Sequence, residues 1–214
     1  MKNLKIDSRG LRGYTAGFLA LIMVFGAQAL TQEAHGQTNY KITEGTQIQV
    51  SGTSNMHDWT MLAKSFVCEG NFVMKGGTLK DVSSLNFSLG VTNLKSKDKL
   101  MDTRAHKTLK ADQFSKMTFK LTEATVVPGQ KTINAVGNLT IGGVTNKITL
   151  QTNYVVNADQ TITCKGSKLI KMSDFDIKAP SFMLGALKTG NEVTIALDLK
   201  FKQVNTIHTS NNTK

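Results

Sequence analysis

The sequence VGNLTIGGVTNKITL, from Val136 to Leu150, carries the clearest structural signal in this chain. Apolar residues alternate with polar ones on both sides of Gly142 and Gly143, and a period of two places one face of a strand in a core and the other in water. Two adjacent glycines accept the positive φ angles that a two-residue hairpin turn requires. The stretch therefore predicts two antiparallel strands joined by a tight turn, and sequential strands of this kind usually start an antiparallel sheet.

The same alternation recurs along most of the chain, and turn signals such as Pro128-Gly129 separate the apolar runs. About eight strands at intervals of roughly a dozen residues are typical of a sandwich or an up-and-down barrel, and periodicity alone does not choose between them. Leu62 is expected to face inward with Phe72, and Val127 with Phe119. The expected strands cover residues 47–52, 59–74, 85–91, 117–127, 133–141, 144–156, 162–172 and 193–201.

Two segments break this pattern. Residues 94–114 are polar and charged, with apolar residues at roughly helical spacing, which predicts one or two short helical turns. The segment either covers the mouth or side of a sheet or is a plain surface connection. Residues 173–190 are irregular but contain several apolar side chains, so parts of this segment are expected to be buried. The basic residues of the first segment, which outnumber its acidic ones, are Lys95, Lys97, Lys99, Arg104, Lys107 and Lys110.

The N-terminus resembles a secretory signal peptide. A basic region ending at Arg12 precedes a mostly apolar run from Gly13 to Leu30, and small residues follow. Of two small-x-small sites, the one just before Gln37 is favoured; an uncleaved membrane anchor is the alternative. We therefore expect a signal peptide over residues 1–36, a barrel domain over 37–204 and a flexible tail over 205–214, with the protein periplasmic or secreted.

The charge of the chain bears on its partners. Its formal net charge is +11, and a basic exported protein is attracted to anionic lipid head groups. A transient contact with a membrane surface is one expectation, and an ordinary solvated surface is the other. No nucleic-acid partner is expected, and the oligomeric state, including a dimer, stays open.

Residues with catalytic or metal-binding potential are sparse. The chain has no Gly-x-Ser-x-Gly elbow and no phosphate-binding Gly-x-x-x-x-Gly-Lys loop, so we expect no enzyme activity. His57 and His106 with Asp58 or Asp102 would be the only metal set, and no i, i+4 histidine pair supports it, so no metal is expected. The alternative is that His57 and Trp59 close a strand entrance and His106 forms hydrogen bonds within the helical segment.

The two cysteines, Cys68 and Cys164, both lie on apolar strand faces. Cysteines can pair in an oxidising compartment, and they also serve as small buried apolar residues. Pairing needs Cα atoms within about 7 Å, which the sequence does not show. Both alternatives stay open.

Three stretches resemble the YceI-like family, also described as a lipid- or polyisoprenoid-binding domain. The hairpin matches Gly-x-Leu-Thr-Ile-x-Gly-Val-Thr from Gly137 to Thr145. A second match runs from Met101 to Phe119, where a basic, His-containing segment leads into a strand with a Thr-Phe pair. A third and weaker match lies between Val50 and Phe72. Together the matches span roughly 40–203, and the departure is Ser115-Lys116, where the family usually has a proline.

The resemblance implies an all-β fold, an extended antiparallel eight-stranded lipocalin-like barrel with a short helical segment between strands. It also implies that an isoprenoid lipid is held lengthwise in the barrel, for storage, transport or envelope stress response, without another cofactor. Sequence alone favours a solid core, whereas the resemblance favours an open lumen. A filled barrel with a structural or stress-protective role through protein partners is the alternative.

The expected ligand-binding residues are the inward apolar side chains and one cation at the mouth. A planar guanidinium can hold two oxygens of an anionic lipid head group, which makes arginine the best single candidate in the basic segment. The predicted set is Trp59, Phe66, Phe72, Phe87, Leu89, Phe119, Leu139, Ile148, Leu197 and Arg104.

Overall fold

The computed structural model describes residues 37–204. The signal peptide predicted for 1–36 and the tail predicted for 205–214 lie outside the described residues. Within the described part, no helix has the length and apolar character needed to cross a membrane. The strands of these described residues run from Gln37 to Gln203 and enclose one hydrophobic core.

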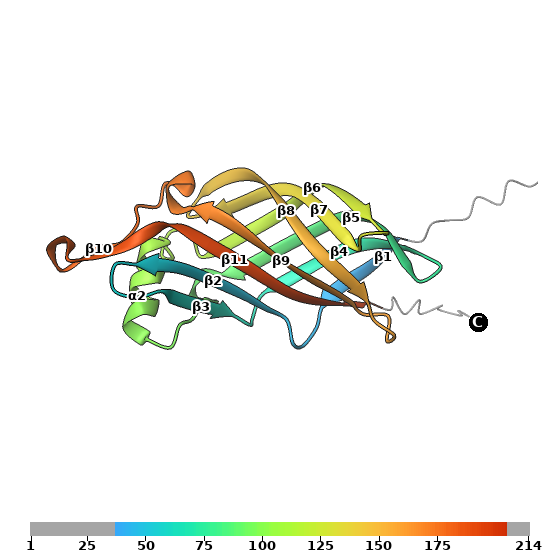
Figure 1. Ribbon diagram of the computed structural model, residues 1–214, viewed down its shortest axis with the longest axis horizontal. Helices are drawn as coiled ribbons and strands as arrows, with labels where there is room; N and C mark the ends of the chain where they lie inside the picture. Colours follow the sequence, from blue (N-terminus) through green and yellow to red (C-terminus); the bar gives the residue numbers. More distant parts are fainter. Residues whose placement is uncertain (1–36, 205–214) are drawn as a thin grey trace, which may run out of the picture. The chain divides into compact units, whose positions relative to one another are not determined.

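The described chain is a barrel of antiparallel strands with one α-helix and three short 3-10 turns (Figure 1). The helical elements are η1 (Val91–Asn93), α2 (Lys99–Thr108), η2 (Met172–Phe175) and η3 (Met183–Gly185). The strands are β1 (Gln37–Ile42), β2 (Gln47–Ser54), β3 (Trp59–Ala63), β4 (Val67–Lys75), β5 (Thr78–Gly90), β6 (Lys116–Val127), β7 (Thr132–Ile141), β8 (Val144–Val156), β9 (Ile162–Lys171), β10 (Ser181–Phe182) and β11 (Leu187–Gln203).

Eight strand positions close the barrel, as the resemblance predicted. From β4 the sheet runs in sequence order through β5 to β9 and then to β11. Two positions are interrupted strands. The first position is shared by β1 and β2, which both pair with β11. The second is shared by β3, which pairs with β2, and β4, which pairs with β1. Closure leaves few free edges in the sheet.

The predicted hairpin is confirmed. β7 and β8 pair from Thr132 opposite Asn153 to Ile141 opposite Val144. The turn between them is Gly142-Gly143, with φ angles of 57° and 85°. A side chain at Gly143 would overlap the ring of Phe114, so the second glycine is also required by packing.

Two predictions of strand faces are wrong. The long strand expected from 59 to 74 is interrupted at residues 64–66, and this interruption changes the inward register. In β3, Met61 and Ala63 are buried, whereas Leu62 is half-buried and its backbone pairs with Lys95. In β6, a bulge follows Leu121, so that Ala124 and Val126 pack on the core in place of Val127. A bulge adds one residue to a strand and shifts the alternation after it.

The end of the barrel that lies away from α2 is filled by aromatic side chains. Phe72 packs against Tyr40 and Phe201 with ring centroids 5.0 and 5.1 Å apart. All three side chains are almost completely buried. Aromatic pairs of this geometry add to the free energy gained from burial, so this cluster is expected to anchor the fold.

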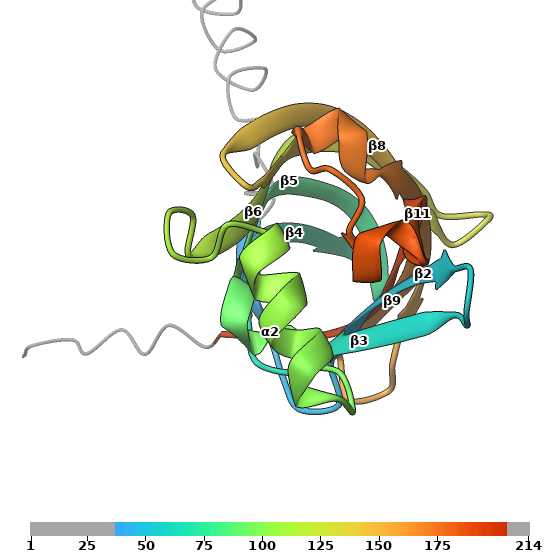
Figure 2. The same cartoon turned by 90° about the vertical axis from the view of Figure 1, so that its left-hand side faces the viewer.

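The helix α2 lies across the opposite end of the barrel (Figure 2). It has 10 residues, which is longer than the one or two turns predicted. Asp98 is the N-cap, and its carboxylate accepts hydrogen bonds from the backbone N–H groups of Leu100 and Met101. The covering segment is therefore an ordered helix rather than a plain surface connection.

Candidate functional site

The interior of the barrel contains two apolar cavities that follow one another. The mouth chamber, with a volume of about 300 Å³, lies beneath α2. The inner chamber, with a volume of about 150 Å³, lies deeper in the barrel. Both are lined by Val50, Met117, Ile141 and Ile195, so the two chambers adjoin at this ring of four side chains. The two chambers therefore adjoin inside the barrel, and Phe72 and Phe201 of the aromatic cluster line the inner one.

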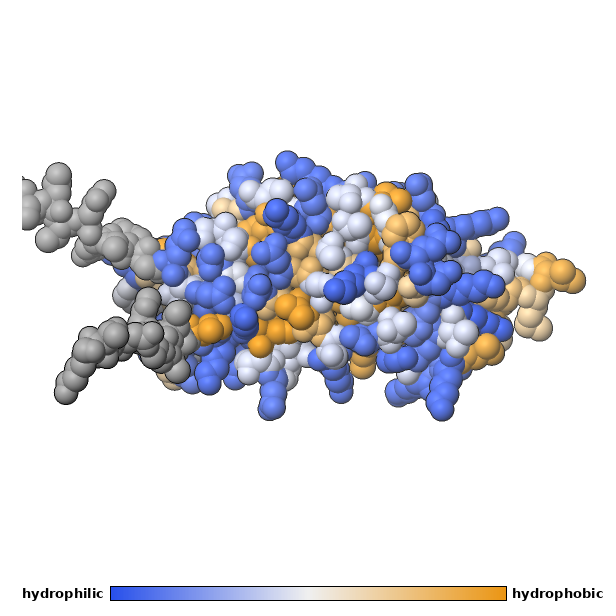
Figure 3. Space-filling view, turned by 180° about the vertical axis from the view of Figure 1, so that it is seen from behind, coloured by the Kyte–Doolittle hydropathy of each residue, from blue (hydrophilic) through white to orange (hydrophobic). Residues whose placement is uncertain are grey.

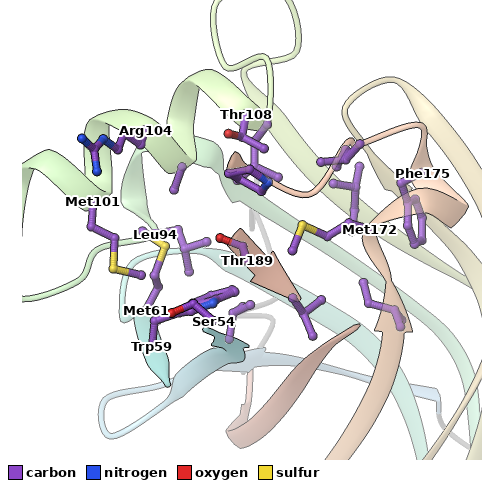
Figure 4. Close-up of a pocket in the computed structure, with 18 of the residues that line it drawn as sticks. Ser54, Trp59, Met61, Leu94, Met101, Arg104, Thr108, Met172, Phe175 and Thr189 are labelled. Carbon is purple, nitrogen blue, oxygen red and sulfur yellow. The ribbon is translucent and has the colours of Figure 1, made fainter. Parts of the chain in front are cut away.

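The wall of the mouth chamber comes from segments far apart in the sequence (Figure 4). α2 contributes Met101 and Arg104, β3 contributes Trp59, and η2 contributes Met172 and Phe175. The indole of Trp59 lies flat against Gly52 of β2, where any Cβ would overlap it. Its Nε1–H donates to the carbonyl of Thr53 at 3.2 Å. These contacts fix the ring at the edge of the chamber.

Polar groups are concentrated at the mouth. The guanidinium carbon of Arg104 lies 4.3 Å from the centroid of the Phe182 ring, a cation–π distance. Asp98 and His57 also line the mouth chamber, and the ring Nδ1 of His57 is 2.9 Å from the carbonyl of Asp58. The inner chamber is apolar apart from Thr152 and Lys168. An elongated ligand with one polar end would therefore place that end at the mouth.

Hydrogen bonds hold α2 over the mouth. The Asp102 carboxylate accepts from the backbone N–H and the hydroxyl of Ser96, at 2.6 and 2.8 Å. Burial acts to raise the pKa of this carboxyl, but the bonds from Ser96, helped by the charges of Lys95 and His106, outweigh burial and lower its pKa. Nε2 of His106 is 2.8 Å from the carbonyl of Leu94. As predicted for this histidine, its hydrogen bond is structural and lies within the covering segment.

The two cysteines lie in the wall of the inner chamber. Both are free thiols in the structure. Burial raises the pKa of Cys68 and of Cys164 to about 12, and the proximity of the two thiols adds to the shift at Cys68. Thiols with such a high pKa react slowly, so here they act as small apolar wall residues.

The structure distributes the predicted ligand residues over the lumen as follows. Trp59 and Arg104 line the mouth chamber. Phe66 lines neither chamber; it packs edge-on against Phe87 at a centroid distance of 5.5 Å. The residues lining the inner chamber are Phe72, Phe87, Leu89, Phe119, Leu139, Ile148 and Leu197. Their contact with a ligand stays a prediction.

The contribution of the irregular segment, residues 173–190, to the mouth could not be predicted from the sequence. Phe175, Ile177, Phe182 and Leu187 all line the mouth chamber, although they belong to the irregular segment. The apolar content of that segment was a signal of burial, but irregular backbone has no period from which a facing direction can be read. Only the folded chain shows that these residues line the same chamber as α2.

Groups suited to metal binding do not assemble within residues 37–204. No three His, Cys, Asp or Glu side chains come close enough there to hold a metal ion. His57 and His106, the two histidines of the described chain, form hydrogen bonds to backbone carbonyls. The side chains that line the two chambers are mainly apolar.

Comparison with known proteins gives one family and several structures. The sequence profile of the YceI-like domain matches residues 30–201. No match was found among curated proteins. BcnA of Burkholderia cenocepacia is similar in structure with a TM-score of 0.58, 20% identity, and coverage of 72% of this chain and 95% of that chain.

Two further solved structures share the fold. A polyisoprenoid binding domain from Saccharophagus degradans has a TM-score of 0.59 at 12% identity, covering 79% of this chain and 100% of that chain. The YCEI protein of Campylobacter jejuni has a TM-score of 0.52 at 15% identity, covering 65% and 82%. At these identities the likeness is one of fold.

Proposed function

Because the chain belongs to the YceI-like domain family, we propose that it holds a long apolar lipid, of the polyisoprenoid class, lengthwise in the barrel. The observation that carries the proposal is the pair of adjoining apolar chambers in the barrel, with the polar groups concentrated at the mouth. Each buried methylene contributes about 0.8 kcal/mol, so a long chain binds without directional contacts. The solved domain from Saccharophagus degradans, which is described as polyisoprenoid binding, supports the same ligand class.

The alternative function, a filled barrel acting through protein partners, has less support. The aromatic cluster of Tyr40, Phe72 and Phe201 fills part of the interior, but two chambers of about 300 and 150 Å³ leave space inside the barrel. Storage, transport and envelope stress response all remain compatible with a bound lipid. We propose binding and carrying as the activity, without a chemical step.

The position of Trp59 offers a direct binding experiment. It is the only tryptophan of the chain, and its ring lies in the wall of the mouth chamber. Titration of delipidated protein with a long-chain isoprenoid should change the tryptophan emission in a saturable way. A short-chain alcohol of the same head group is the matched control and should bind far more weakly. Absence of saturation with any chain length would contradict lipid binding.

Arg104 provides a test of the polar end. Its guanidinium borders the mouth chamber and is held over Phe182, so we propose that it attracts the head group of the lipid. A phosphorylated isoprenoid should bind more tightly than the neutral alcohol, by about tenfold at low salt, since hydrogen bonds to charged groups contribute about 1.5–3 kcal/mol. Arg104→Ala should narrow this difference, and Lys107→Ala on the exposed side of α2 is the control. Equal affinity for both lipids, unchanged in Arg104→Ala, would leave the apolar lumen as the only binding element.

Export is a further part of the proposal. The basic region, the apolar run and the small-x-small site before Gln37 support cleavage of residues 1–36 and a periplasmic or secreted location. Intact mass measurement of the protein from its native host should give a chain that starts at or near Gln37, in the soluble envelope fraction. A chain that retains Met1 and stays in the membrane fraction would overturn this proposal.

A further inference from the structure

An apolar turn projects from the mouth of the barrel. η3, between β10 and β11, carries Met183 and Leu184, whose exposed fractions are 76% and 111%. In the space-filling view this turn is an apolar projection at one end of the molecule, next to hydrophilic side chains (Figure 3). Adjacent apolar side chains with a polar border, unlike single scattered ones, are typical of a contact surface.

The backbone of this turn is strained. Met183 and Leu184 have φ angles of 52° and 54°, in the left-handed region that long side chains adopt rarely. Gly185, which follows with a φ of 92°, is the residue that suits such a turn. The strained conformation keeps both apolar side chains directed into solvent, whereas the neighbouring Phe182 lines the mouth chamber.

Further exposed apolar side chains lie on the same rim. Asn55 is tied to the base of the turn by hydrogen bonds to the carbonyl of Ala186 and from the N–H of Lys188, and its neighbour Met56 is 67% exposed. On the other side, Leu100 of α2 is 55% exposed and lies one helical turn before Arg104, which contacts Phe182. The rim of the mouth is therefore apolar on two sides of the turn.

Two lysines border the turn along the sequence, and two more flank the start of α2. The sequence from Lys178 to Lys188 begins and ends with lysine and contains no acidic residue. Lys97 and Lys99 flank the start of α2, where the nearby Asp98 is engaged as the helix cap. Apolar side chains bordered by lysines are the pattern of elements that insert into the interface of an anionic bilayer.

We propose that the η3 turn, with Met183 and Leu184 at its tip, docks the mouth of the barrel onto an anionic lipid bilayer. A protein partner would need about 800 Å² of complementary surface, whereas shallow insertion of two side chains between lysines suits a bilayer. Docking would place the mouth chamber at the membrane, where an apolar lipid could enter without crossing water. This role in lipid exchange rests on the proposed function, but docking itself does not.

The test uses the chain that begins at Gln37, which contains the whole barrel, and phosphatidylcholine vesicles with or without phosphatidylglycerol. Co-sedimentation should show binding to the anionic vesicles and little to the neutral ones. Met183→Asn with Leu184→Asn should weaken it by at least about tenfold, because burial of a leucine-sized side chain contributes about 1.5–3 kcal/mol. Lys178→Gln with Lys188→Gln should weaken binding by about fivefold for each lysine.

Asparagine is chosen because it tolerates the left-handed region, so the double variant should melt at the same temperature as the parent or above it. Leu169→Asn, at a 54% exposed position on the outer face of β9, is the matched control and should leave vesicle binding unchanged. Equal sedimentation of the parent and the Met183/Leu184 variant would overturn the proposal. A parent that ignores anionic vesicles but becomes smaller in solution on this substitution would show that the turn binds a second copy instead.

Vesicle docking by the η3 turn and isoprenoid binding in the barrel can be tested separately. Isoprenoid delivered from a cyclodextrin complex should still change the Trp59 emission of the double variant. If vesicle docking fails while this uptake persists, only the docking role of the η3 turn is refuted. If docking persists without uptake, the lipid-binding function fails on its own.

Discussion

Ile195→Trp is expected to weaken binding of long-chain lipids by at least about 100-fold. Ile195 lies in the ring of four side chains shared by the two chambers, and an indole there would fill the passage between them. A ligand that loses the inner chamber loses contacts equivalent to about four methylenes, each contributing about 0.8 kcal/mol. Native mass spectrometry of the protein loaded with isoprenoids of increasing length would measure this effect.

The same substitution should spare short ligands, because the mouth chamber remains open. Ala196→Trp is the matched control, since the neighbouring residue on β11 points to the other face of the strand and lines neither chamber. If Ile195→Trp still took up the long chain as well as Ala196→Trp, the inner chamber would play no part in binding. A circular-dichroism melt of both variants would separate blockage from misfolding.

Phe72→Ala is expected to have the largest effect on stability. Phe72 is 1% exposed and lies between Tyr40 and Phe201. Replacing a buried phenylalanine by alanine costs about 3–5 kcal/mol. For a domain of this size each kcal/mol lowers the midpoint of thermal unfolding by about 2–4 °C, so the midpoint should fall by roughly 10 °C.

Phe87→Ala is the matched comparison for Phe72→Ala. Phe87 is only half-buried and lines the inner chamber, so its removal enlarges a space that already exists. It should alter ligand affinity and chain-length preference more than the melting temperature. Equal, large losses of stability in both variants, without any effect on lipid uptake, would indicate a filled barrel instead of a lumen.

The β fold and the character of its interior could be predicted because strand periodicity is a local property. Leu139 and Phe119 were assigned to the inner face from alternation alone, and both are buried. The prediction failed where an irregularity shifted the register, at residues 64–66 and at the bulge after Leu121. One added residue moves every later side chain of a strand to the opposite face of the sheet. Nothing in the sequence marks where that residue is.

The mouth of the site could be predicted only in part. Trp59 and Arg104 were named from residue type and from the resemblance, and both line the mouth chamber. Phe175 and Phe182, which line the same chamber, were not named, because their position depends on how an irregular segment folds. The exposure of Met183 and Leu184 could not be read from the sequence either, since an apolar pair in a partly buried segment would ordinarily be assigned to the core.

The most direct test of the central claim is mass spectrometry of lipids extracted from the protein purified from its native host without detergent. We expect one class of long-chain isoprenoid lipid in near-equimolar amount, and a reduced amount in a preparation of the Ile195→Trp variant. Protein that contains no extractable lipid, and that takes up none when it is incubated with long-chain isoprenoids, would contradict the account.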